Sequence, residues 1–285
     1  MPQGRGRKSW PPRARGPSAF RNVLGLVAYD GTAYAGSQVQ ANARTIQGEL
    51  ERALASICDE PIRIDLAGRT DAGVHATGQV MSFATATKLD GATIGRGVNA
   101  LLPADIAVRE LAETDGDFHA RYSATGRTYE YRIRSASQRE PLERHREHWL
   151  PQPLDLGAMR RAADLLIGRR DLSAFAVGLG PPREGAERRD RGREREIRRA
   201  EWHGEGTLLR FEIEADGFLR GSVRGIVGTL LQVGRATTSV ERFAEVVASR
   251  DRGQAGPSAP AAGLCLIRVE YEGARRRAAD EEEEE

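Results

Sequence analysis

The spacing between two strand patterns constrains the fold of this chain most strongly. Apolar and polar residues alternate over residues 196–203 and again over 207–215, and only residues 204–206 separate the two runs. Neighbouring parallel strands need a crossover of a dozen or more residues, whereas a hairpin needs only a few. The short link therefore favours an antiparallel pair. Together with the helical patterns elsewhere in the chain, it predicts an α+β fold with a largely antiparallel sheet.

The first half of the chain mixes strand and helix signals. An apolar run over residues 23–29 ends at the turn signal Asp30-Gly31. Thr45 precedes apolar residues that recur at helical spacing, which predicts an N-capped helix. Further strands are expected over 62–66, 78–84 and 106–111, and a further helix over 90–101, closed by Pro103.

The second half repeats this mixture. We expect strands over 128–134, 196–203, 207–215 and 264–269, and helices over 155–167, 220–233 and 240–249. Asp155 is the expected cap of the first of these helices, and Gly168 is its expected stop. The arginine-rich segment 181–199 lies between these patterns, and we interpret it as a surface insertion whose arginines suit phosphate binding.

Both ends of the chain are polar and biased in charge. Residues 1–21 combine arginines with proline and glycine, and residues 280–285 are an aspartate followed by five glutamates. Because such segments cannot bury enough apolar surface to fold, we expect disordered tails over 1–21 and 273–285, the first touching RNA. No apolar run approaches the length of a membrane span, and no secretory signal is present, so a cytoplasmic location is expected.

The cysteine and histidine positions argue against a metal site. Cys58 and Cys265 stand far apart without a C-x-x-C partner, which is too little for a disulfide framework or a thiolate site. His145 and His148 have no further cysteine or histidine nearby, so zinc is not expected. The glycine-bearing loops match neither a phosphate loop nor a dinucleotide fingerprint. We therefore expect no metal and no nucleotide cofactor.

The densest cluster of reactive residue types is the loop Gly68-Arg69-Thr70-Asp71-Ala72-Gly73-Val74-His75. An aspartate beside small residues most often forms a turn in which its carboxylate bonds its own backbone. This loop, however, directly follows an apolar strand, where rigid scaffolds place reactive groups. Arg69 stands two residues before Asp71, and a guanidinium that close can hold a carboxylate ionised and oriented. On the local sequence alone, the structural and the catalytic interpretations both stay open.

These eight residues resemble the signature loop of the tRNA pseudouridine synthase A (TruA) family. Segments similar to other motifs of that family lie at 29–32, 117–121, 127–131, 218–228 and 262–264. The similarity thus covers roughly residues 23–272. It implies the pseudouridine synthase fold, in which two pseudo-symmetric α/β subdomains, here 22–124 and 125–272, share a central sheet. It also implies a homodimer that isomerises uridine at positions 38, 39 and 40 of the tRNA anticodon stem-loop, without cofactor or metal.

The resemblance also assigns roles to individual residues. It implies Asp71 as the catalytic aspartate, Arg69 as a neighbour that positions Asp71 or the flipped nucleotide, and Tyr129 as the aromatic that packs on the uracil. Arg224 and Leu264 would complete the pocket. Whether the carboxylate attacks the ribose or abstracts a proton from it stays open.

Simpler interpretations exist for several of these residues. Tyr129 and Tyr131 alternate on a predicted strand, so we expect one of them to face inward, and Tyr129 could be plain core. Arg224 lies on an apolar helix face, and a buried arginine needs a carboxylate or phosphate partner. His75 and His119 are interpreted as structural hydrogen-bonding residues.

The chain departs from the family pattern at three positions. Ser37 stands where an aromatic residue is usual, and Ser222 and Gly225 replace a methionine and an asparagine or arginine. These changes affect the expected contacts with RNA more than the catalytic loop. They support a second hypothesis, a non-catalytic tRNA-binding protein on the same scaffold. A carbohydrate-active enzyme is a third, weakened because no second acidic residue accompanies Asp71.

Removal of residues 1–21 tests the basic N-terminal tail. Cationic side chains that contact phosphates release counterions, so the salt dependence of binding grows with the number of contacts. We expect the shortened chain to bind tRNA with a shallower slope of log binding constant against log salt, measured by titration at several salt concentrations. An unchanged slope would exclude the tail from the interface.

Overall fold

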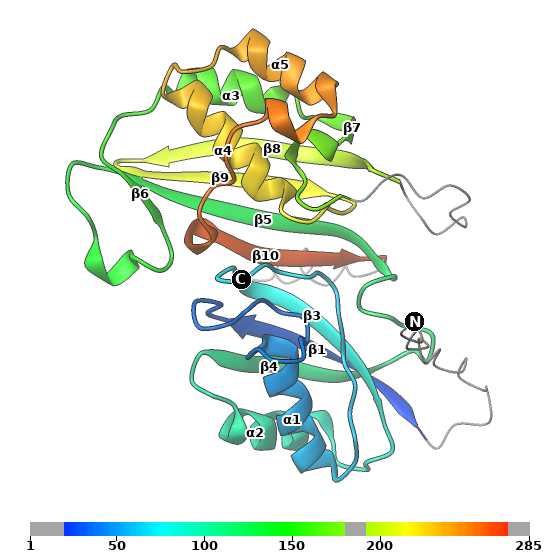
Figure 1. Ribbon diagram of the computed structural model, residues 1–285. Coiled ribbons are helices and arrows are strands. Elements are labelled where there is room, and N and C mark those ends of the chain that lie inside the picture. The colour runs from blue at the N-terminus through cyan, green and yellow to red at the C-terminus, as the bar shows by residue number, and fades with distance from the viewer. Residues whose placement is uncertain (1–19, 180–191, 273–285) are drawn as a thin grey trace, which may run out of the picture.

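One twisted sheet runs through the centre of the molecule (Figure 1) in the computed structural model, which describes residues 20–179 and 192–272. Within these residues the strand order is β4-β1-β3-β10-β5-β9-β8-β7, with β2 beside β3 and β6 beside β5. The strands are β1 (Arg21–Tyr29), β2 (Asp65–Leu66), β3 (His75–Thr85), β4 (Ile106–Thr114), β5 (Ala124–Ser135), β6 (His148–Leu150), β7 (Gly168–Asp171), β8 (Glu194–Glu205), β9 (Leu208–Ala215) and β10 (Leu264–Tyr271). The helices are α1 (Ile46–Cys58), α2 (Gly91–Leu101), α3 (Leu156–Asp164), α4 (Ser222–Gly234) and α5 (Val240–Ser249).

Most neighbouring strands are antiparallel, as the short link after residue 203 predicted. β8 and β9 form the expected hairpin, and β1 pairs antiparallel with both β3 and β4. Within the described ranges, the only parallel pairs are β3 with β10 and β5 with β6. The α+β fold with a largely antiparallel sheet is therefore confirmed.

The last strand joins the two halves of the sheet. β10 lies between β3 and β5, and its pairing with β3 is limited to Cys265 and Leu266. Beyond this point the register of β10 shifts, and the carbonyl oxygen of Ile267 approaches Gly78 so closely that a Cβ there would lie 2.1 Å from it. Only glycine allows the two backbones to meet in this way.

Side chains at the helix starts explain where these helices begin. Thr45 and Asp155 each accept a hydrogen bond from the backbone N–H three residues on, at 3.2 and 2.8 Å, which confirms both predicted caps. α3 ends at Asp164, earlier than predicted, because the N–H of Leu165 bonds the carbonyl of Ala162 in a tighter turn. Figure 1 shows α1 and α2 beside the N-terminal strands, α3 and α4 beside β8 and β9, and α5 outside α3 and α4.

The two faces of the C-terminal half of the sheet differ in character. One set of alternating residues is fully buried in the main core and includes Tyr131, Ile133, Phe211 and Ile213. The intervening residues of β8 and β9 carry charge: Arg199 pairs with both Glu212 and Glu214. The helices therefore cover one face, and ion pairs occupy the other.

The predicted surface insertion over 181–199 is wrong at its C-terminal end. β8 begins at Glu194, and residues 180–191 lie outside the described ranges. Arg198 contacts Glu214 at 3.4 Å and Glu270 at 3.2 Å, and Arg199 contacts Glu214 at 3.4 Å. Because these acids already balance the two arginines, we no longer expect them to bind phosphates.

Two other predicted boundaries also shift. The strand expected over 62–66 is limited to Asp65 and Leu66. The backbone of Ile64 bonds side chains of α1 instead of a neighbouring strand. Glu51 accepts a hydrogen bond from the Ile64 N–H at 3.1 Å, and Gln47 donates one to the Ile64 carbonyl at 3.3 Å. β1 begins at Arg21, so the N-terminal tail predicted over 1–21 is too long. Deletion of residues 1–19 is therefore the cleaner test of the tail's contribution to tRNA binding. Residues 1–19 and 273–285 lie outside the described ranges.

A Gly78→Ala substitution tests the junction between β3 and β10. The added methyl group would collide with the backbone at Ile267, and we expect a loss of about 1–3 kcal/mol in the free energy of unfolding. Gly116→Ala is the matched control, because a Cβ there meets nothing within 4 Å. Urea unfolding of both variants gives the comparison, and equal stabilities would contradict the close approach.

Candidate active site

The loop 68–75 connects β2 to β3 and is anchored at its first residue. The side chain of Gln79, fully buried on β3, accepts a hydrogen bond from the N–H of Gly68 at 3.2 Å and donates to its carbonyl at 2.7 Å. The N–H of Ala67 bonds the carbonyl of Val80 at 2.8 Å. The loop therefore leaves the sheet from a fixed point.

Ser37 fixes the middle of the loop. The Thr70 N–H donates to Ser37 Oγ at 2.8 Å, and the Ser37 N–H donates to the Thr70 carbonyl at 3.0 Å. Ser37 is fully buried, and a Cβ on the preceding Gly36 would lie 2.9 Å from the same Thr70 carbonyl. Serine at this position therefore exchanges hydrogen bonds with the backbone of the loop 68–75, and its side chain is not available to RNA.

The hydroxyl of Tyr29 adds a second attachment. It lies 2.9 Å from Thr70 Oγ1 and accepts a hydrogen bond from Gln79 Nε2 at 3.3 Å. Burial raises the pKa of Tyr29 to about 12, so the hydroxyl stays protonated at neutral pH. Thr70, the residue before Asp71, is thus held through both its backbone and its side chain.

His75 ties the end of the loop to the other half of the protein. Its Nδ1 accepts the N–H of Gly31 at 3.2 Å, and its Nε2 lies 3.2 Å from the carbonyl of Ala262. The same Nδ1 also lies 3.2 Å from Asp30 Oδ1, so the ring contacts the turn after β1 through both a backbone and a carboxylate group. This is the structural hydrogen-bonding role that the sequence predicted for His75.

Asp71 faces two arginines from the start of α4. Arg224 Nη1 lies 3.6 Å from Asp71 Oδ2, and Arg220 Nε lies 3.9 Å from Oδ1. The carboxylate is 30% exposed, and it accepts no hydrogen bond from the described part of the chain. Arg224 is itself oriented by a hydrogen bond from its Nε to the Ala259 carbonyl at 2.7 Å. The carboxylate thus has charge partners and keeps its oxygens accessible.

The structure corrects the expectation that Arg69 holds Asp71. Arg69 is exposed, and among the described residues the ion pairs of Asp71 are with Arg220 and Arg224 only. Burial and the nearby charge of Arg121 lower the pKa of Arg69. Sequence reasoning missed Arg220. It lies in the turn before Gly221, the N-cap of α4, so helical spacing from Arg224 does not predict where its side chain points.

Tyr129 lies beside the loop but belongs also to the core. It is 8% exposed, its ring meets Phe218 edge-on at 5.3 Å, and a Cβ on Gly68 would lie 3.6 Å from its hydroxyl. That hydroxyl makes no hydrogen bond with the described residues. Tyr131 is buried on the same face, so the expectation that only one of the two tyrosines faces inward is wrong; residues two apart on a strand share a face.

The other predicted pocket residue, Leu264, opens β10 opposite Tyr131 and is buried in the main core. The departures at Ser222 and Gly225 also prove to be packing positions. Ser222 is fully buried and donates to the Leu219 carbonyl at 2.8 Å. A Cβ at Gly225 would lie 2.3 Å from the carbonyl oxygen of Phe175, so a larger residue would displace that backbone.

Comparison with known proteins identifies the fold family. A family model described as tRNA pseudouridine synthase matches residues 26–123 and 162–272. The chain belongs to the tRNA pseudouridine synthase family. The two matched segments of this tRNA pseudouridine synthase contain the two sides of the site, the loop with Asp71 in the first and Arg224 in the second.

Individual relatives agree over most of their length. A tRNA pseudouridine synthase A from Chloroflexus aurantiacus is 47% identical over 252 residues, which cover 88% of this chain and 89% of the relative. The protein of the same name from Geobacillus kaustophilus is 41% identical over a stretch that covers 87% of this chain and 93% of the relative. That from Acetivibrio thermocellus is 39% identical over 88% of this chain and its own full length. The resemblance drawn from the motifs is confirmed.

The described ranges contain neither a candidate metal cluster nor a candidate membrane-spanning helix. No group of three or more histidine, cysteine, aspartate or glutamate side chains there is arranged to hold a metal ion. No helix in the same ranges is both long enough and apolar enough to cross a membrane.

Ser37→Ala tests the attachment of the loop 68–75. The Thr70 N–H would lose its acceptor in a buried position, so we expect a loss of about 1–3 kcal/mol in the free energy of unfolding and a lower rate constant for the chemical step. Urea unfolding and single-turnover kinetics measure the two effects. Ser135→Ala, which removes a hydroxyl bonded to the Gln152 carbonyl in the C-terminal half, should leave the rate unchanged. A Ser37→Ala variant as fast as its control would show that the loop does not depend on this contact.

Proposed function

We propose that this protein converts uridine to pseudouridine in the anticodon stem-loop of tRNA, at positions 38, 39 and 40, with Asp71 as the catalytic carboxylate and without cofactor or metal. The observation that carries the proposal is the state of Asp71, an accessible carboxylate on a fixed loop between two guanidinium groups. Relatives named tRNA pseudouridine synthase A support the substrate and the reaction.

The surroundings of Asp71 suit either step open to it. Attack on C1′ of the ribose and abstraction of a ribose proton both need a negatively charged carboxylate with a free oxygen lone pair. The guanidinium groups of Arg220 and Arg224 stabilise that charge by attraction, at distances too long for tight hydrogen bonds. The same charges would attract the phosphates that flank the target nucleotide.

The apolar wall beside the loop suits a flipped base. A uridine in a stem must leave its stack to be reached, at a cost of a few kcal/mol that contacts in the pocket have to offset. Tyr129 offers a ring held by Phe218, together with a hydroxyl that has no protein partner among the described residues. Leu264 and Arg224 would form the rest of the pocket. The positions of Tyr129, Leu264 and Arg224 are the basis of the proposed contact with the base.

The binding-protein alternative loses its main support. It rested on the missing aromatic at Ser37, but that side chain is buried and serves the loop backbone. A pure binding protein has no use for an accessible carboxylate beside RNA phosphates. The carbohydrate-active alternative is weakened further, because in the described ranges Asp71 is paired with two arginines and not with a second carboxylate.

The expected homodimer and the cytoplasmic location stay predictions that rest on the resemblance and on the sequence. The contribution of the N-terminal tail to tRNA binding likewise stays a prediction, because residues 1–19 are outside the described ranges.

Asp71→Asn tests the catalytic role. The amide keeps the shape of the side chain and removes its charge, so we expect pseudouridine formation to fall by at least about 10²-fold while tRNA binding is retained. An unmodified tRNA transcript is incubated with each protein without added cofactor, and pseudouridine is mapped by position. Asp164→Asn, an exposed carboxylate on α3, is the control and should react like wild type.

The outcomes of this experiment separate the proposals. Pseudouridine at 38, 39 or 40 from wild type and the control, but not from Asp71→Asn, supports both the site and the residue. Pseudouridine elsewhere in the tRNA would overturn the anticodon assignment. No product from wild type, with tight tRNA binding, would favour the binding protein.

A further inference from the structure

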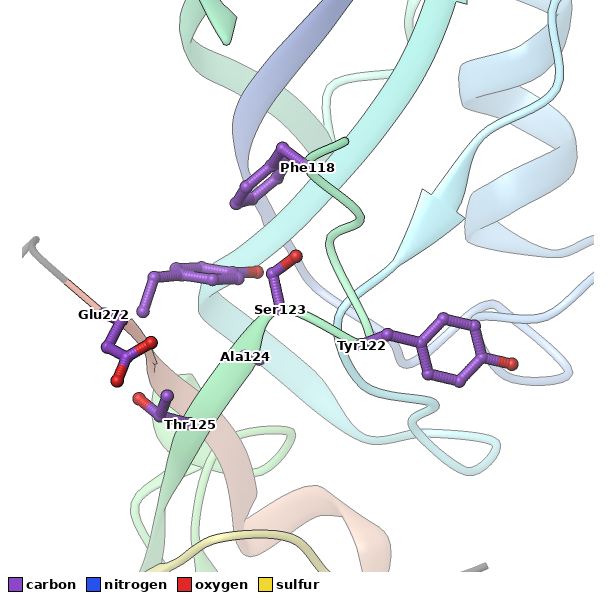
Figure 2. Close-up of a pocket in the computed structure, with 7 residues that line it drawn as sticks. Phe118, Tyr122, Ser123, Ala124, Thr125 and Glu272 are labelled. Atoms are coloured by element: carbon purple, nitrogen blue, oxygen red, sulfur yellow. The ribbon is translucent and has the colours of Figure 1, made fainter. Parts of the chain in front are cut away.

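The turn between β4 and β5 is built rigidly and exposes one aromatic ring. Ala120 is fully buried, its N–H donates to Ser82 Oγ at 3.0 Å, and its carbonyl accepts from the hydroxyl of Tyr271 at 2.8 Å. Phe118 packs on Tyr271 with the ring centres 5.0 Å apart. Tyr122, by contrast, is 67% exposed, and Figure 2 shows its ring pointing away from Phe118.

The exposed ring has polar and cationic neighbours that favour nucleic acid. The His119 ring lies 4.4 Å from the Tyr122 ring, tilted by 54°, and the Arg121 guanidinium lies 5.8 Å from the ring centre. His119 in turn lies 3.5 Å from Asp65, and its Nδ1 accepts the N–H of Arg121 at 3.1 Å. We call His119, Arg121 and Tyr122 the Tyr122 platform.

Arg127 places this platform beside the catalytic loop. A single atom, Arg127 Nη2, donates to the carbonyl of Ala67 at 3.0 Å and to that of Arg121 at 2.8 Å. Residue 67 immediately precedes the loop, so both segments meet at one buried guanidinium. The electrostatic effect of Arg121 on Arg69 agrees with this, because it contributes to the lowered pKa of Arg69.

The charged residues around the Tyr122 platform indicate where an RNA backbone would lie. Within the described residues, Arg69 and Arg121 have no carboxylate partner, whereas many other arginines of the protein do. A hollow next to Tyr122 is lined by Phe118, Tyr271 and the carboxylate-bearing Glu272 (Figure 2). An RNA backbone is therefore attracted toward Arg69 and Arg121 and repelled by Glu272.

We propose that Tyr122 stacks on an unpaired base of the RNA substrate adjoining the flipped uridine, while Arg121 and Arg69 bind the phosphate beside it. An exposed aromatic ring next to unpaired arginines is the combination by which proteins hold single-stranded RNA. The ring is held ready by its turn, so little order is lost on binding. This inference rests on the proposed function, since it places the platform next to the target nucleotide.

Tyr122→Leu and Tyr122→Phe test the stacking. Loss of one base–aromatic stack is expected to weaken tRNA binding by about 5- to 150-fold in Tyr122→Leu, whereas Tyr122→Phe keeps the ring and should bind like wild type. The control is Leu142→Ala, which trims another exposed hydrophobic side chain and should also bind like wild type. Thermal unfolding verifies that all variants are folded, because Tyr122 contributes little to the core.

A fluorescent base reports stacking directly. The tRNA carries 2-aminopurine at each position flanking the target uridine in turn, and the platform predicts quenching at one of them by wild type and Tyr122→Phe but not by Tyr122→Leu. Weaker binding without a change in quenching would overturn the stacking role. Arg121→Gln should lower the slope of log binding constant against log salt by about 0.7–0.9, the share of one phosphate, and an unchanged slope would remove Arg121 from the proposal.

These readouts distinguish this inference from the proposed function. If wild type makes pseudouridine and Tyr122→Leu binds and reacts equally well, the platform is wrong and the enzyme assignment stands. If no protein makes pseudouridine but Tyr122→Leu loses affinity and quenching, the platform stands as an RNA contact and the catalytic assignment falls.

Discussion

The narrow junction between β3 and β10 is the constraint on which the rest of the structure depends. Asp71 comes from the N-terminal half, and its partners Arg220 and Arg224 come from the C-terminal half. They meet because the last strand is inserted beside β3, where Gly78 lets the two backbones touch. The bond from His75 to Ala262 crosses the same junction. A small shift there would separate the Asp71 carboxylate from the guanidinium groups of Arg220 and Arg224. The geometry of the site therefore depends on the packing at this junction.

The distribution of arginine partners says more about RNA binding than the net charge of +2. Arg198 and Arg199 looked from the sequence like part of a basic insertion, but acids on β9 and β10 already balance them on the open face of the sheet. Arg69 and Arg121 are the contrasting case. Arg69 belongs to the loop 68–75, Arg121 is linked to the start of that loop through Arg127, and neither has a carboxylate partner in the described ranges. Structure is needed to tell them apart, because the balancing acids lie far away in sequence.

Local signals predicted much of the fold and part of the site. The Thr45 and Asp155 caps, the hairpin of β8 and β9, and the loop before β3 follow from contacts within a few residues. The short strands β6 and β7 escaped prediction because three or four residues hold too little periodicity. Nearness in sequence also misled the assignment of Arg69, since the direction of a side chain is set by the fold around it. The function of Ser37 could not be read from residue type, because its partner Thr70 lies 33 residues away.

Two aspartates in this chain show why composition alone could not decide the role of Asp71. Asp30 and Asp71 both stand in turns, with a glycine one residue after Asp30 and two residues after Asp71. At Asp30, burial is outweighed by hydrogen bonds from Thr32, one from its N–H at 2.9 Å, which hold the pKa of Asp30 below its ordinary value. That carboxylate bonds its own backbone, as is usual for such turns. At Asp71 the turn is closed by the main chain instead, through the Val74 N–H and the Asp71 carbonyl. Because the backbone and Ser37 hold the loop without it, the Asp71 side chain is not needed to close its own turn and instead faces Arg220 and Arg224.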